Sequence, residues 1–240
     1  FGAALFASHF PAPVRSLGST FVQGMTFGGR ALPGVARFAR KAALPAAESL
    51  FEWCSWFDRR QITSLMGQPT DGDPASSYLE AFARTKGAGT LNRLLYTNAR
   101  TYLLDDLLPK VDRMTMAHGL EARSPFLDTD LAVFAASLPD RAKWRGSSGK
   151  RLLKSVIAAQ FPLGFFDRKK QGFAVPLDRW FRNELRPFLQ DTLSSRARLR
   201  NFLDGAVVDD LVADHQTLAQ NHGSRLWTLL TLELWLRKYA

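Results

Sequence analysis

The chain has 240 residues, of which 46% are hydrophobic and 22% charged, so it can bury a sizeable core and is not a disordered or low-complexity protein. Its 32 basic and 22 acidic residues give a net charge of +10, which favours anionic partners such as nucleic acid, acidic lipid or phosphorylated small molecules. The single cysteine, Cys54, excludes an intramolecular disulfide and a zinc site built on several cysteines.

Residues 1–44 are rich in Gly, Ala, Phe and Arg, and prolines at positions 11, 13 and 33 interrupt them, so we expect a peripheral arm with short helices. The first residue is Phe1, and no basic-apolar-small signal sequence follows it, so we expect a processed or truncated chain. No stretch approaches the roughly 18 to 20 apolar residues that a membrane-spanning helix needs. We therefore expect a soluble protein.

Residues 45–240 are expected to form a helical part, because apolar residues recur there at steps of three and four, as at Leu50, Cys54 and Phe57. Strand-type alternation is scarce, so the predicted fold class is mainly α. Further helices are predicted at about 60–66, 75–84, 89–106, 110–118, 129–137, 149–160, 178–194, 205–220 and 224–238.

Two local signals predict where helices begin. Asp128 is expected to cap the helix that follows it, and Ser147 or Ser148 the helix that contains Lys150. The segment 71–74, Asp-Gly-Asp-Pro, reads as a turn.

Familiar catalytic and metal motifs are missing from the sequence. The four histidines, at positions 9, 118, 215 and 222, lack the close pairing of a zinc protease, so we expect no metal site on them. There is no nucleophile elbow, no Walker-type loop and no dinucleotide fingerprint. A self-contained nucleotide site of a familiar kind is therefore not expected.

Two basic segments are associated with glycine. The first, residues 141–151, runs through a Gly-Ser turn into a predicted helix whose free amides could meet an anion. The second, residues 168–173 (Arg-Lys-Lys-Gln-Gly-Phe), suits a loop positioned over a phosphate. A lysine there is a compact cation with three donors, able to follow charge onto phosphate oxygens as a bond breaks. The alternative, a solvated run of charges, stays open.

Carboxylates at Asp105, Asp106 and Asp112 could hold Mg²⁺ or form ion pairs with Lys110 and Arg113. With basic residues so near, we expect the ion pairs.

Glu121 and Arg123 form a charged pair inside the apolar frame of residues 119–128. Such a pair is costly unless the two side chains are satisfied locally or face a pocket.

Four segments occur in an order that resembles the asparagine synthase family. They are residues 110–117 (Lys-Val-Asp-Arg-Met-Thr-Met-Ala), 120–128 (Leu-Glu-Ala-Arg-Ser-Pro-Phe-Leu-Asp), 149–150 (Gly-Lys) and 168–173. The resemblance is specific from about residue 101 to 176 and weaker over about 44–240. It implies the helical C-terminal portion of the synthetase domain of a glutamine-hydrolysing asparagine synthetase. That domain is an α/β adenine-nucleotide α-hydrolase-like (PP-loop) fold, of which this chain lacks most of the parallel sheet.

The resemblance also implies an activity. In that family an N-terminal glutaminase domain releases ammonia from glutamine, and the synthetase domain uses ATP and Mg²⁺ to activate aspartate as an acyl-adenylate. Ammonia then yields asparagine, with AMP and pyrophosphate released. The N-terminal cysteine, the Ser-Gly-Gly-rich pyrophosphate loop and a later acidic segment are missing here, and the internal Cys54 cannot replace that nucleophile. We expect the isolated segment to be inactive, with ATP and Mg²⁺ bound mainly by other parts.

By the same resemblance, Lys170 is the catalytic residue that contacts the phosphates and stabilises pyrophosphate as it departs. Arg168 would support its loop, and Gly172 would give the loop room. Lys150 would be a second phosphate contact, although a surface lysine at a helix end fits equally well.

Four more residues are expected to support the substrate cleft by the resemblance: Glu121, Arg123, Asp105 and Asp112. For Glu121 and Arg123 we favour bracing of the cleft wall over contact with aspartate.

Three alternatives remain. The chain could act on another carboxylate, as a natural-product cyclase or amidotransferase of the same family. It could be a nucleic-acid-binding module that stacks bases on tryptophans, a reading disfavoured because these tryptophans lie at helical spacing with other apolar residues. It could also serve mainly as the helical shell of a larger enzyme. The tryptophans in question are Trp53, Trp56, Trp144 and Trp180.

We expect a cytoplasmic location, no membrane partner and an exposed apolar face where the sheet is lacking. A homodimer is left open.

Overall fold

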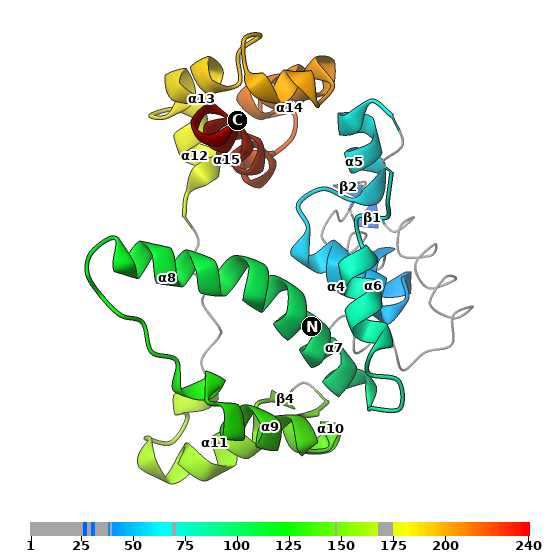
Figure 1. Ribbon diagram of the computed structural model, residues 1–240, viewed down its shortest axis with the longest axis vertical. Helices are drawn as coiled ribbons and strands as arrows, with labels where there is room; N and C mark the ends of the chain where they lie inside the picture. The colour runs from blue at the N-terminus through cyan, green and yellow to red at the C-terminus, as the bar shows by residue number, and fades with distance from the viewer. Residues whose placement is uncertain are drawn as a thin grey trace. The chain divides into compact units, whose positions relative to one another are not determined.

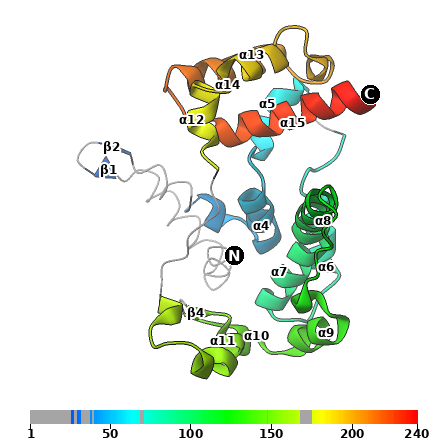
Figure 2. The same ribbon diagram turned by 90° about the vertical axis from the view of Figure 1, so that its left-hand side faces the viewer.

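The computed structural model is mainly α, as predicted (Figures 1 and 2). Within its described part, strands occur only as two antiparallel pairs of two residues each, β1 (Thr26–Phe27) with β2 (Arg30–Ala31) and β3 (Trp144–Arg145) with β4 (Ser148–Gly149). No described helix is long and apolar enough to cross a membrane. The structure describes residues 26–27, 30–31, 38, 40–68, 71–146, 148–167 and 175–240.

The chain divides into two compact units. Unit 1 comprises Phe1–Cys54 and Ala75–Lys169, and unit 2 comprises Ser55–Pro74 and Lys170–Ala240. The predicted boundary at residue 44 stays a prediction, because most of residues 1–37 lie outside the described part.

Unit 1 is built around three helices that pack on one another, α4 (Ala46–Cys54), α6 (Ser76–Ala83) and α7 (Thr90–Asn98). Their centre is the buried trio Leu50, Leu91 and Leu94, with Trp144 of β3 packed against it. Burying a leucine side chain contributes roughly 1.5 to 3 kcal/mol, so these residues hold the three helices together.

The helix that begins with α7 continues without a break through η1 (Ala99–Leu107) into α8 (Leu108–Met116). The sequence predicted two separate helices here, at about 89–106 and 110–118, and this separation is wrong. Pro109 lies in the first turn of α8, where the N–H that proline lacks matters least. Before it, η1 has the wider π register, and the Leu108 amide bonds to the carbonyl of Leu103, five residues back.

The remaining elements of unit 1 follow α8 along the chain. Asp128 caps α9 as predicted, because its carboxylate accepts a hydrogen bond from the Leu131 amide at 3.0 Å. The helix predicted at 149–160 begins two residues later, since Ser148 belongs to β4 and Lys150 is the N-cap; Ser147 lies outside the described residues. The elements of unit 1 after α8 are η2 (Pro125–Leu127), α9 (Thr129–Ser137), α10 (Asp140–Lys143), β3, β4, α11 (Arg151–Ile157), η3 (Ala158–Gln160) and η4 (Phe165–Asp167).

Unit 2 packs its helices around the C-terminal helix α15, which contacts α12, α13, α14 and η5. The helix predicted at 178–194 is two helices, because Pro187 cannot continue an existing helix and sits instead in the first turn of α13. The elements of unit 2 are α5 (Arg59–Met66), α12 (Leu177–Arg182), α13 (Arg186–Thr192), η5 (Arg198–Asn201), α14 (Gly205–Gln216) and α15 (Gly223–Tyr239).

Two charged side chains, Glu233 and Arg200, connect parts of unit 2 through ion pairs and hydrogen bonds. Glu233 of α15 is 1% exposed, accepts a hydrogen bond from the Leu199 amide at 2.9 Å and pairs with Arg237 at 2.7 Å. Arg200 donates to the carbonyls of Ser194, Leu193 and Gly205 and pairs with Asp209 at 2.5 Å. These contacts fix the loop from α13 to α14 against the core.

Candidate functional site

The predicted catalytic residue, Lys170, lies outside the described residues. Lys170, with Arg168 and Gly172, falls in the segment 168–174. The predicted roles of these three residues stay predictions.

Lys150 is described, and its backbone is unusual. It is the N-cap of α11 with φ 56° and ψ 36°, in the left-handed region that non-glycine residues rarely occupy, and its side chain is exposed. The preceding Gly149 packs under Trp144, and a Cβ added at Gly149 would come within 2.9 Å of that ring. The hairpin β3–β4 therefore presents Lys150 at its end on a tightly packed stem.

Lys150 is one of six basic residues between positions 139 and 157, and Asp140 is the only acidic residue there. Arg151 donates a hydrogen bond to the carbonyl of Arg141 at 2.7 Å, which keeps these two cations close together. Within the described part no ion pair neutralises this basic segment. It suits an anionic ligand by charge. The other basic residues are Arg141, Lys143, Arg145, Arg151 and Lys154.

Asp140 forms no ion pair with this segment within the described part, and its carboxylate instead accepts hydrogen bonds from the backbone amides of Leu91 at 3.1 Å and Asn92 at 3.3 Å. Asn92 donates in turn to the carbonyl of Leu138 at 3.1 Å and accepts from Lys143. Burial lowers the pKa of Lys143, and Asp140 partly opposes that shift. The start of the basic segment is thereby clamped to α7. Sequence reasoning missed this clamp, and only the Pro139-Asp140 pair hinted at a helix start there.

Glu121 and Arg123 meet in the extended segment between α8 and η2. Two hydrogen bonds of 3.1 Å join the Arg123 guanidinium to the two carboxylate oxygens of Glu121. Both side chains are exposed, 68% for Glu121 and 82% for Arg123, so this pair adds little to stability. The two side chains neutralise each other's charge, and both remain accessible to solvent.

The acidic residues near α8 do not form a metal site. Asp106 pairs with Lys110 at 3.4 Å, as the sequence predicted, whereas Asp112 has no ion-pair partner among the described residues, so the predicted pair with Arg113 is not found there. Asp105 is exposed on η1. No group of three or more His, Cys, Asp or Glu in the described part could hold a metal ion. The described residues therefore offer no ready-made cluster of three or more side-chain ligands for the Mg²⁺ that the resemblance implies.

Cys54 lies half-buried at the end of α4 and is not an activated nucleophile. Burial raises the pKa of its thiol, although the Tyr78 hydroxyl partly opposes this. Tyr78 is itself held in a largely apolar site, where burial raises its pKa to about 12. A thiol with a raised pKa carries little thiolate at neutral pH.

The four tryptophans differ in their surroundings. Trp144 packs on the core of unit 1, and Trp53 lies under the Lys41 ammonium, 4.9 Å from its ring centre. Trp56 is 59% exposed and Trp180 is 36% exposed. Core packing accounts for Trp144, although this residue lies in strand β3 and not on a helix.

The structure brings some of the predicted residues together and leaves others apart. Glu121 and Arg123 bond to each other, but no described hydrogen bond or ion pair joins either of them to Lys150, Asp105 or Asp112.

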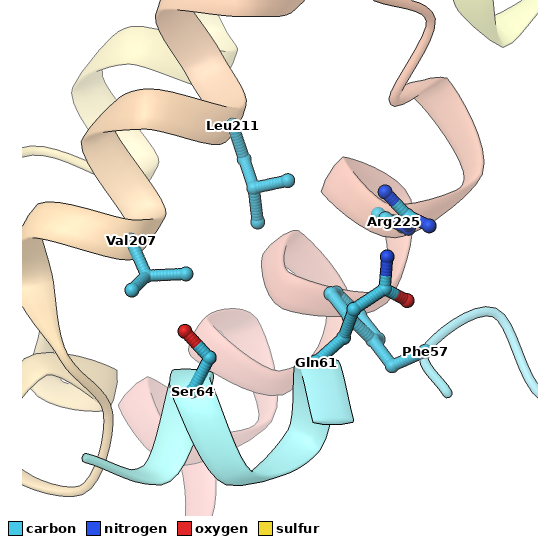
Figure 3. A pocket seen from close by; sticks show the side chains of 6 residues that line it. All are labelled: Phe57, Gln61, Ser64, Val207, Leu211 and Arg225. Atoms are coloured by element: carbon cyan, nitrogen blue, oxygen red, sulfur yellow. The ribbon is translucent and has the colours of Figure 1, made fainter. Parts of the chain in front are cut away.

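A small pocket of about 70 Å³ lies in unit 2 and contains none of the predicted residues. Figure 3 shows side chains from α5, α14 and α15 pointing into it. Its volume is far below the roughly 300 to 1,000 Å³ of a typical ligand site. Its lining residues are Phe57, Gln61, Ser64, Val207, Leu211 and Arg225.

Comparison with known proteins links these residues to a family. Residues 22–237 match the sequence profile of the family described as Asparagine synthase. The chain is 29% identical over 154 residues to "Asparagine synthetase [glutamine-hydrolyzing] 1" of Bacillus subtilis (strain 168), and 33% identical over 155 residues to "Putative asparagine synthetase [glutamine-hydrolyzing]" of Mycobacterium tuberculosis (strain H37Rv). Each alignment covers 64% of this chain and 24% of the relative, so the chain spans about a quarter of these relatives' length. No solved structure matches significantly.

Proposed function

Because the chain belongs to the asparagine synthase family, we propose that it supplies the helical C-terminal part of an ATP-dependent amide ligase. The observation that carries the proposal is the family match, which extends over residues 22–237 and includes all four segments of the sequence resemblance. The proposed reaction joins ammonia to the side-chain carboxylate of aspartate through an acyl-adenylate and releases AMP and pyrophosphate.

The surface of unit 1 supports a role as one layer of a larger domain. Its helices and the loops between them leave large apolar side chains uncovered, and the sequence predicted such exposure for helices that lack a sheet to cover. A helical layer with so much exposed apolar surface is suited to packing against another part of a protein. The most exposed of these side chains are Met114, Leu120, Phe126, Val133, Val156 and Leu163.

The basic segment supports the phosphate-binding role. Lys150, and with it Lys170 and Arg168, would hold the phosphate groups of ATP. Negative charge grows on the pyrophosphate oxygens as the bond to the adenylate phosphorus breaks, so a fixed cation there stabilises the transition state more than the ground state. In this proposal, Mg²⁺ is bound mainly by other parts of the protein.

Glutamine is the proposed nitrogen source, because the relatives are named as glutamine-hydrolysing enzymes. Cys54 does not hydrolyse glutamine in this proposal, since burial suppresses its thiolate. Glutamine hydrolysis is assigned to another part of the protein.

The test measures pyrophosphate release and asparagine formation by the protein of the full reading frame, with ATP, aspartate and ammonium chloride as substrates. Lys170→Ala should lower the rate by about 100- to 1000-fold, the usual cost of removing one such electrostatic donor. Lys86→Ala, at an exposed lysine of the α6–α7 turn, is the matched control and should keep the wild-type rate.

Three results would count against parts of the proposal. Wild-type pyrophosphate release by Lys170→Ala would overturn the role of that lysine. Pyrophosphate release with a different carboxylate, and none with aspartate, would correct the substrate. Absence of release with any carboxylate, together with steeply salt-dependent binding to generic DNA or RNA, would favour the nucleic-acid module instead.

A further inference from the structure

Three helices of unit 2 meet at two buried histidines. His215, in the last turn of α14, has no exposed surface, and His222, the N-cap of α15, is 4% exposed. The turn that joins α14 to α15 lies between them and contains Leu218 in the left-handed conformation, with φ 63°. Both histidines therefore lie at the ends of a tight connection between two helices of unit 2.

Each imidazole uses its Nδ1 atom as a hydrogen-bond acceptor. The His222 backbone amide donates to Nδ1 of His215 at 3.1 Å, and the Arg225 guanidinium lies 3.1 Å from Nδ1 of His222. An amide and a guanidinium can only donate, so both Nδ1 atoms carry no proton. Both rings are therefore neutral, with their hydrogen on Nε2.

The elements packed around the histidines add charged groups. Arg182 of α12 donates to the backbone carbonyl of His215 at 2.9 Å and lies 3.4 Å from its Nδ1. Asp178 of α12 accepts from the Asn221 side chain. On the other side, Asp214 of α14 lies 3.6 Å from Nε2 of His222, opposite Arg225. Each histidine thus faces one guanidinium and one carboxylate.

This setting disfavours the protonated rings. Burial lowers the pKa of His215, and Arg182 lowers it further, while Asp178 partly opposes the shift. Burial lowers the pKa of His222 and Arg225 lowers it further, while Asp214 partly opposes the shift. In addition, a proton added to Nδ1 of His215 would face the His222 amide and the Arg182 guanidinium, which are both donors, so it would find no acceptor there.

We propose that His215 and His222 form an acid-sensitive latch, which holds the α14–α15 turn against α12 while both rings are neutral and releases it when they are protonated. A proton on Nδ1 of His215 removes the acceptor of the His222 amide and places a positive charge beside Arg182. A proton on Nδ1 of His222 removes the acceptor of the Arg225 guanidinium and places a second positive charge beside it. The first event breaks the bond that joins α14 to the start of α15 and repels Arg182 of α12, and the second breaks a contact within the first turn of α15.

The direction of the pH dependence follows from linkage. An ordinary histidine has a pKa of 6.5, and in the closed latch it is lower, so the open state binds more protons. The latch is fully closed above about pH 6.5 and weakens as the pH falls below it. Each histidine can change the opening constant by up to about tenfold per pH unit.

Hydrogen exchange of the backbone amides of residues 215–226 tests the proposal on the full chain, after correction for the intrinsic pH dependence of exchange. In the wild type, protection of the His222 amide should fall at least about tenfold between pH 7.5 and 5.0. The double variant His215→Asn, His222→Asn keeps a side-chain acceptor near each Nδ1 position and cannot be protonated. Its protection should not depend on pH.

The control is His118→Asn, which changes an exposed histidine in the turn after α8 and should behave as the wild type. Protection of the wild-type His222 amide that does not change with pH would overturn the latch, as would an undiminished pH response in the double variant. Should that variant fail to fold, the wild-type imidazole titrations seen by NMR decide the matter. Titration of both rings near pH 6.5 with the amide still protected contradicts the latch, whereas loss of protection in step with protonation supports it.

Discussion

Asp140 caps a helix that begins 50 residues before it in the chain. Its carboxylate accepts hydrogen bonds from the amides of Leu91 and Asn92, two of the donors that the first turn of α7 leaves unpaired. Gly89 makes this approach possible, because a Cβ at that position would collide with the carboxylate. The cap therefore joins the basic segment to the core of unit 1.

Asp140→Ala should destabilise the protein by about 1 to 2 kcal/mol, because it leaves two helix donors without an acceptor. Urea unfolding followed by circular dichroism measures this loss. Asp71→Ala, at an exposed bend residue, is the control and should change stability by less than about 0.5 kcal/mol. Equal stability of the two variants would mean that solvent satisfies the α7 amides when Asp140 is absent.

Glu233→Gln tests the ion pair between the buried Glu233 and the partly exposed Arg237 of α15. Glutamine can still accept from the Leu199 amide but loses the charge opposite Arg237, so we expect a loss of about 1.5 to 3 kcal/mol at pH 7. Glu80→Gln, at an exposed position of α6, should be neutral. A cost below about 0.5 kcal/mol for Glu233→Gln would show that the ion pair contributes nothing.

The same pair predicts a pH dependence. Burial raises the pKa of Glu233, but the hydrogen bonds from Leu199 and Arg237 outweigh it, so the pKa of this carboxyl lies below its ordinary value of 4.5. A carboxyl whose folded pKa is lowered stabilises the fold above the unfolded pKa and loses that contribution as the pH falls. The difference in stability between wild type and Glu233→Gln should therefore shrink below about pH 4.5. Denaturant unfolding at pH 6 and pH 4 checks this, and a constant difference contradicts it.

Arg200→Lys should cost about 1 to 3 kcal/mol despite conserving the charge. The guanidinium reaches three backbone carbonyls and Asp209 at once, and an ammonium group with three donors and a different shape cannot reproduce that fork. Arg186→Lys, on the exposed first turn of α13, is the control. Thermal unfolding of the two variants compares them, and an equal Tm would show that charge alone matters at position 200.

Local chemistry explains which features could be predicted from the sequence. The helix at 129–137 and its Asp128 cap were predicted correctly because cap and helix are adjacent in the chain. The break before α13 follows from Pro187, a local signal that the helical periodicity concealed. The Asp140 cap depends on a partner 49 residues away, which no local pattern reveals.

The candidate site likewise combines features that follow from local sequence with features that depend on the surrounding structure. The Glu121–Arg123 pair could be inferred from the proximity of the two residues in the chain, and the structure shows how they satisfy each other. The left-handed backbone of Lys150 could not be inferred, because it is imposed by the β3–β4 hairpin and by Trp144 packed on Gly149. Interpreting residues 149–160 as a plain helix concealed this conformation.

Lys150→Gly separates structure from function at this position. A left-handed conformation costs an ordinary residue roughly 1 to 2 kcal/mol, and glycine adopts it freely, so a lysine retained only for structure should be improved by this change. We expect thermal unfolding to show a small rise in Tm. Pyrophosphate release by the protein of the full reading frame should fall nonetheless, because the proposed phosphate contact is lost. Lys150→Ala, which removes the cation and keeps the strain, should lose activity equally without gaining stability. Unchanged release in both variants would reduce Lys150 to a surface lysine and leave the proposed phosphate contact to Lys170 and Arg168.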